Sequence, residues 1–83
     1  PNPFNPTTNI RFGLPKDSKV KIEIYNIVGQ KVRTLRNSHF AAGYHTITWD
    51  GRNRFGQAVA SGIYIYRILA GADVAAKKML LVK

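Results

Sequence analysis

The 83-residue chain carries 13 Lys and Arg against 4 Asp and Glu, which gives a formal net charge of +9, and it contains no cysteine. This length allows one core, and the hydrophobic fraction of 45% is that of a folded domain. Disulfides, thiolate metal sites and a cysteine nucleophile are therefore excluded, and no apolar run reaches the ~20 residues of a membrane-spanning helix. The charge favours anionic partners, although the cations are spread along the chain as on an ordinary solvated surface.

Residues 1–6, PNPFNP, are rich in proline. Proline fixes φ and removes a backbone donor, so this segment can neither start a helix nor lie in a central strand. We therefore expect a stiff lead-in or linker at residues 1–6 and one folded domain at residues 7–83.

Period-two alternation of apolar and polar residues recurs along residues 8–35 and indicates β-strands. A first strand is expected at 8–14 and a second at 19–25. The inward positions of the two strands are Ile10, Phe12, Leu14, Val20, Ile22 and Ile24. Lys19, Lys21 and Glu23 are expected to face water.

A connection at residues 26–29 is expected to place Gly29 at positive φ, and a third strand to follow at 30–35. The odd spacing of Val32 and Leu35 predicts a bulge or bend in this strand. Residues 37–43 are expected to form a loop.

The second half of the chain predicts three more strands, at 44–49, at 63–70 and from residue 74 or 75 to 82. The strand at 63–70 is apolar on both faces and is expected to be central. The segment 50–62 is expected to be an ordered loop that crosses between sheets, with Asp50 accepting backbone hydrogen bonds and Val59 in the core. Gly51 and Gly56 are expected at positive φ, and Trp49 beneath the loop.

Strands at this spacing predict an all-β fold, a small immunoglobulin-like antiparallel β-sandwich of about six or seven strands. The chain shows no arrangement of residues that carries catalysis. His39 and His45 lack ligand spacing, no serine lies in a GxSxG elbow, and Arg52 and Arg54 spoil a calcium loop at residues 50–56. We therefore expect no enzyme activity, no metal and no cofactor, and nucleic-acid binding is disfavoured because no binding motif appears.

Four segments taken together carry a family resemblance: PNPFNPTTNIRFGLP, VKIEIYNIVGQKV, AGYHTITWDGRNRFGQAVASGIYIYR and KKMLLVK. In this order and spacing they resemble the C-terminal sorting domains of the type IX secretion system of Bacteroidetes. They are also similar to the immunoglobulin-like domain of the flagellar hook-capping family, which shares the pattern WDGxxxxGxxVxSGxYxY. The resemblance covers essentially all 83 residues.

The resemblance implies a set of recurrent structural residues. They are Pro1, Asn2, Pro3, Gly29, Val32, Ser61, Gly62 and Tyr64, with Trp49, Asp50, Gly51 and Gly56 from the shared hook-capping pattern. It also implies a non-catalytic domain that directs an exported cargo from the periplasm through the outer membrane to the cell surface or medium. Its partners would be the outer-membrane secretion machinery, a sorting protease and an upstream cargo domain.

A sandwich of so few strands has open edges, to which another chain can add a strand. The predicted docking edge is the basic final strand, with Lys77, Lys78, Met79, Leu81 and Lys83. Its lysines would attract an acidic receptor, or equally would guard the edge against aggregation. The alternative functions are a structural or accessory module such as a surface spacer or hook-cap part, self-association through the edges, and a glycan-binding module that uses Tyr25, Tyr44 or Phe55.

Overall fold

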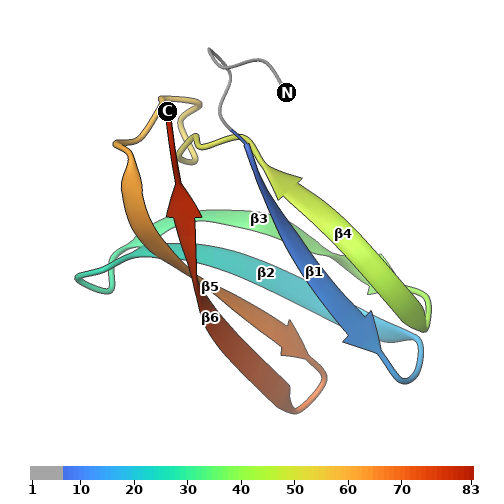
Figure 1. The fold of residues 1–83 in the computed structure, drawn as a ribbon. Coiled ribbons are helices and arrows are strands. Elements are labelled where there is room, and N and C mark those ends of the chain that lie inside the picture. Colours follow the sequence, from blue (N-terminus) through green and yellow to red (C-terminus); the bar gives the residue numbers. More distant parts are fainter. Residues whose placement is uncertain (1–6) are drawn as a thin grey trace.

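A computed structural model describes residues 7–83 of the chain (Figure 1). It contains six strands: β1 (Thr8–Leu14), β2 (Ser18–Asn26), β3 (Lys31–Phe40), β4 (Gly43–Trp49), β5 (Gly62–Ala70) and β6 (Asp73–Leu81). The predicted lead-in, with Pro1, Asn2 and Pro3, lies outside the described residues. Residues 7–83 contain no helix long and apolar enough to cross a membrane.

The strands form two antiparallel layers, as the alternation predicted (Figure 1). The smaller sheet pairs β1 with β4, and the larger has the order β3-β2-β5-β6. Segment 50–61 carries the chain from β4 in the small sheet to β5 in the large one, which confirms the predicted crossing loop. The expected all-β sandwich is therefore the observed fold.

The core lies between the two layers and is made by the predicted inward faces. Its fully buried side chains are Val20, Ile22 and Ile24 of β2, Ile10 of β1, Trp49 of β4 and Leu81 of β6. Each aliphatic side chain buried in this way stabilises the fold by about 1.5–3 kcal/mol relative to exposure. Removing one such side chain from a core this thin should therefore cost a large part of the total stability.

Glu23 corrects one prediction, because it was expected to face water and is only 4% exposed. The Lys31 ammonium lies 2.6 Å from its Oε2, and that of Lys21 lies 3.7 Å away. The hydrogen bond from Lys31 lowers the pKa of the Glu23 carboxyl, against the opposing effect of its burial. The carboxylate is therefore covered by its own cationic neighbours on the sheet.

β3 corrects a second prediction, because residues 37–40 were expected in a loop and instead continue the strand to Phe40. Polar residues here occupy an edge strand that pairs with β2, with Asn37 opposite Lys21 and His39 opposite Lys19. An edge strand with one wet face tolerates such residues, which the composition alone made look like a turn. The predicted irregularity is confirmed by two register shifts between β2 and β3.

β5 is central, as predicted, because it pairs with β2 on one side and β6 on the other. The register places Asn26 opposite Tyr64, and Gly62 opposite Leu81, at one end of the large sheet. Thr8 pairs with Trp49 at the start of β1, so segment 50–61 and both described chain ends lie at this same end (Figure 1). The short turns at 15–17, 41–42 and 71–72 lie at the other end.

Candidate functional site

The free edge of β6 is the candidate site that the sequence predicted. Within residues 7–83, β6 pairs only with β5, and the register is regular from the pair of Ala70 with Asp73 to the pair of Gly62 with Leu81. Its first six residues are exposed on both faces, and the strand is fixed to the core only near its end, by half-buried Met79 and fully buried Leu81. The outer side of this strand therefore presents backbone donors and acceptors to solvent.

The predicted docking residues do not all face the same way. Lys77 is paired with inward-facing Tyr66 and Lys78 with outward-facing Ile65, so the two ammonium groups flank the edge from opposite faces. Leu81 is part of the core, so only its backbone can meet a partner. Lys83 lies beyond the strand, where its backbone N–H donates to Ser61 Oγ at 3.2 Å.

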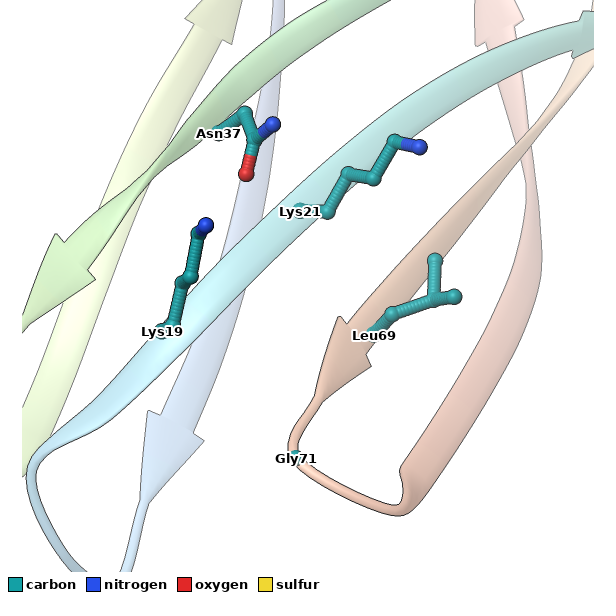
Figure 2. Close-up of a pocket in the computed structure, with 5 residues that line it drawn as sticks. All are labelled: Lys19, Lys21, Asn37, Leu69 and Gly71. Carbon is teal, nitrogen blue, oxygen red and sulfur yellow. The ribbon is translucent and has the colours of Figure 1, made fainter.

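The outer face of the large sheet carries a shallow hollow of about 360 Å³ (Figure 2). Lys19 and Lys21 project from β2 beside Asn37 of β3 and Leu69 of β5. Among the described residues that line it there is no carboxylate, imidazole or hydroxyl group. The hollow is a cationic and aliphatic surface.

A second hollow, of about 460 Å³, lies where Arg11 and Tyr44 of the small sheet approach Lys77 of β6. His45 reaches it, but its Nε2 is 2.7 Å from the Ala41 carbonyl oxygen. Its ring also packs 5.4 Å from the Phe12 ring. His45 thus packs against its neighbours. No group of three His, Asp or Glu that could hold a metal ion occurs within residues 7–83.

Asp17 and Asp50 have structural partners. Asp17 Oδ1 accepts the Ala42 N–H at 2.8 Å and so ties together two turns at one end of the sandwich. Asp50 Oδ1 accepts the Arg52 N–H at 3.1 Å, which confirms the predicted role of Asp50. Both carboxylates thus have structural roles, in a turn contact and in the crossing loop.

The recurrent residues of the WDG segment build the crossing loop. The Trp49 indole N–H donates to the Arg52 carbonyl at 2.9 Å, so the buried ring also satisfies its polar atom. Gly51 and Gly56 adopt φ of 73° and 78°, as predicted, which places them where other residues are strained. Val59 packs against the core, also as predicted.

The other recurrent residues have similar structural positions. Gly29 turns the β2–β3 connection with φ of 85°, and Val32 is half-buried against the core. The Tyr64 hydroxyl donates to the Ala60 carbonyl at 2.6 Å, and burial raises its pKa. Arg33 was missed by the sequence reasoning, although its guanidinium lies 3.2 Å from Asp50 Oδ1. Nothing in the local pattern of β3 singles it out.

The aromatic residues considered for glycan binding do not share a platform. Tyr44 is 95% exposed and pairs with Gly13, at the end of the small sheet opposite to the crossing loop that holds Phe55. Tyr25 is half-buried, with the Arg67 guanidinium 5.9 Å from its ring centre. Stacking along an oligosaccharide or a nucleic-acid strand needs neighbouring faces, which these three rings do not provide.

The pattern of residues that supports the crossing loop is a family pattern. Residues 2–73 match the model of the FlgD Ig-like domain. The chain belongs to this family. Among curated proteins, the basal-body rod modification protein FlgD of Salmonella typhimurium and that of Salmonella typhi are each 40% identical to it over 68 residues. The match covers 77% of the chain but 29% of each relative, so the chain spans less than a third of their length.

Two solved structures resemble the FlgD-like fold of this chain closely. FlgD from P. aeruginosa has a TM-score of 0.72 at 25% identity, covering 90% of this chain and 59% of that one. Dimeric latent PorU from Porphyromonas gingivalis has a TM-score of 0.72 at 26% identity, covering 96% of this chain and 8% of that one. In both cases the likeness covers only part of the larger protein.

Proposed function

We propose that this FlgD-like domain is a non-catalytic structural module of an exported protein, and that the free edge of β6 receives a strand from a neighbouring polypeptide. The observation that carries the proposal is the nine-residue β6, which is regular, paired on one side and exposed on both faces over most of its length. A strand with these properties supplies affinity through its backbone and selectivity through its side chains.

The charges on β6 indicate which kind of strand fits. In an antiparallel pair of two copies centred on Lys77, this residue would lie opposite itself and Lys78 opposite Ala76. Like charges directly opposite each other destabilise a strand pair. The edge therefore disfavours a second copy and favours a strand with acidic residues near its middle.

The family supports a structural role in an exported assembly. The named relatives are basal-body proteins, and the part that resembles this chain makes up less than a third of each. We propose by analogy that this domain likewise serves a larger exported protein that holds other subunits in place.

Site-specific photocrosslinking in cells tests the proposal. A photoreactive residue at Ala76 of β6 should crosslink the parent protein to a neighbouring polypeptide, because this position lies midway along the free edge. The matched control is Asn37 of β3, the other edge of the same sheet. Equal crosslinking at both positions, or none at Ala76, would contradict a docking role for β6.

A second candidate function is the C-terminal sorting signal that the sequence resemblance implied. This candidate rests on the sequence resemblance, and the match to latent PorU, which covers 96% of the chain, adds a likeness of fold. In this case the β6 edge, with Lys77, Lys78 and Met79, would dock on the outer-membrane secretion machinery before a protease removes the domain from its cargo.

Export of a reporter distinguishes the two candidates. Residues 1–83 are fused behind a periplasmic reporter in a host with a type IX system. Sorting predicts that the reporter reaches the medium or the cell surface, and that K77E/K78E reduces export while R36E on β3 does not. Complete retention of the unaltered fusion would exclude sorting and leave the structural role.

A further inference from the structure

Two turns far apart in the chain share one sequence pattern. The β2–β3 turn reads Asn-Ile-Val-Gly-Gln at residues 26–30, and the crossing loop reads Asn-Arg-Phe-Gly-Gln at residues 53–57. Both have the pattern Asn, any residue, an apolar residue, Gly, Gln. We call them the twin turns.

The first turn is closed by a network centred on Asn26. Its Oδ1 accepts the N–H groups of Val28 at 3.1 Å and Gln30 at 2.9 Å, and its Nδ2 donates to Gln30 Oε1 at 2.9 Å. Its backbone carbonyl accepts the Gly29 N–H at 3.1 Å, and its N–H donates to the Gln30 carbonyl at 3.0 Å. Five hydrogen bonds therefore fix five residues.

The second turn repeats the same five bonds around Asn53. Its Oδ1 accepts the N–H groups of Phe55 and Gln57 at 3.0 Å each, and its Nδ2 donates to Gln57 Oε1 at 3.1 Å. Its carbonyl accepts the Gly56 N–H at 3.0 Å, and its N–H donates to the Gln57 carbonyl at 2.9 Å. The two turns are thus built alike, although one closes a hairpin and the other is part of a crossover.

Each network holds an apolar side chain out in solvent. The third residue of each turn, Val28 or Phe55, is 75% or 71% exposed, and Ile27 is 69% exposed. The hydrogen bonds use only the backbone at these positions, so the turns would close equally well around polar side chains. The apolar tips are therefore not explained by the fold.

The twin turns lie side by side at one end of the sandwich. Asn26 and Gln30 line the same hollow of about 380 Å³ as Asn53 and Phe55. Among residues 7–83, six of the eight exposed large hydrophobic side chains lie at this end, because Ile63, Leu80 and Val82 join the three tips. The remaining two, Tyr44 and Val74, lie toward the other end.

Cations surround the apolar tips. Lys31 and Arg54 line the hollow between the turns, and the Arg54 guanidinium lies 4.8 Å from the centre of the Phe55 ring. Exposed Arg52 also belongs to this end, and its guanidinium donates to the Gly56 carbonyl at 2.8 Å. The nearest carboxylates, Glu23 and Asp50, are each in a salt bridge, with Lys31 and with Arg33. The other two carboxylates in residues 7–83, Asp17 and Asp73, lie at the opposite end.

We propose that the twin-turn end of the domain binds the surface of an anionic phospholipid bilayer. Val28 and Phe55 enter the boundary between headgroups and acyl chains, and Arg52 and Arg54 contact lipid phosphates. An anionic bilayer presents negative headgroups directly above an apolar layer. Exposed apolar side chains from separate segments can therefore insert into it beside their cations without needing a pocket that matches their shape. This function is separate from docking at the free edge of β6.

Co-sedimentation of the 83-residue chain with vesicles tests this proposal. We expect binding to vesicles of equal parts phosphatidylglycerol and phosphatidylcholine, little binding to pure phosphatidylcholine, and weaker binding as salt rises. V28D and F55D should each reduce the binding constant about tenfold or more. Each replaces an apolar side chain that would be buried in the bilayer with a negative charge that the anionic lipid repels. V74D, which makes the same change at a side chain 57% exposed near the opposite end, is the matched control.

A second measurement excludes misfolding as the cause. Buried Trp49 reports folding through its emission, and F55W adds a tryptophan at the tip whose emission should shift to the blue when anionic vesicles are added. Absence of vesicle binding would overturn the proposal. So would binding that V74D weakens as much as V28D and F55D, because the charge of the whole domain would then explain it. An F55W emission unchanged by vesicles that do bind would also overturn it.

Discussion

β3 and β6 are the two edges of the same four-stranded sheet, and they end it in different ways. β3 pairs with β2 through two register shifts, and it has side-chain contacts along its length, with Lys31 on Glu23, Arg33 on Asp50 and Phe40 in the core. β6 pairs with β5 without a shift and reaches the core only at Met79 and Leu81. The β3 edge is irregular and fastened by side-chain contacts, and the β6 edge is regular and free.

The difference indicates which of the two edges could accept a strand from another chain. Bulges and long-range side-chain contacts make β3 a poor template for another strand. β6 lacks these features and has Lys77 and Lys78 at its middle, so only charge protects it. If β6 receives a strand as proposed, we expect electrostatics to set the selectivity there, whereas irregular pairing and side-chain contacts close the β3 edge.

Of the changes that test this difference between the edges, removing the core contact of β6 should have the largest effect on stability. Leu81→Ala deletes the one fully buried side chain of the strand and should lower the free energy of unfolding by about 2–5 kcal/mol. Val74→Ala, on the exposed part of the same strand, should change it by less than about 0.5 kcal/mol. Urea denaturation followed by tryptophan emission measures both, and similar losses would show that β6 is packed along its whole length.

Breaking the ion pair of β3 should cost less. Glu23→Gln removes the carboxylate that Lys31 reaches at 2.6 Å, and we expect a loss of about 1–3 kcal/mol at neutral pH. Folding lowers the pKa of Glu23, so its contribution is present above the ordinary carboxyl value of 4.5 and is lost as pH falls through the lowered pKa. Denaturation curves of the two proteins should therefore converge in acid, and a gap that persists there would rule out the charge as its cause.

A smaller effect is expected from the cation that covers the end of β3. The Arg36 guanidinium lies 5.2 Å from the centre of the Phe40 ring, and R36A should cost about 0.5–1 kcal/mol. Lys78→Ala on β6 serves as its counterpart, because Lys78 is exposed and makes no salt bridge or ring contact with the rest of residues 7–83. A thermal melt that ranks the two variants in the opposite order would mean that the β6 lysine has a structural role.

The change with the least effect on stability should sharpen the comparison most. K77V/K78V should change the free energy of unfolding by less than about 0.5 kcal/mol, yet it removes the charges that protect the free edge of β6 from pairing with a second copy. Light scattering should then show association that rises with concentration. The matched variant T34V/R36V on the β3 edge should remain monomeric. If K77V/K78V is also monomeric, something other than charge protects β6.

The sequence allowed most of the sandwich to be predicted, because buried strands alternate strongly. Val20, Ile22 and Ile24 face the core, as their alternate spacing predicted. Gly51 and Gly56 adopt the positive φ that was expected of glycines in the crossing loop. The end of β3 was not predictable, because the polar run at residues 37–39 has the composition of a loop. Only pairing with β2 makes it a strand.

The interaction surfaces were less accessible to sequence reasoning. The basic final strand indicated an edge, but not which of Lys77 and Lys78 lies on the core side of the sheet, which follows from the register with β5. Arg33 and the burial of Glu23 depend on neighbours from other segments, which no local pattern shows. The repeated Asn-x-apolar-Gly-Gln sequence is visible in the printed chain, yet it becomes meaningful only when both turns meet at one end.

That Thr8 and Leu81 both lie at the crossing-loop end of the sandwich bears on protein engineering. A unit whose entry and exit are at one end can be inserted into a surface loop of a host protein without stretching either connection. The three short turns at the distal end then remain open for epitopes or affinity tags. The free edge of β6 would stay accessible in such a chimera, so the graft would bring the proposed docking strand with it.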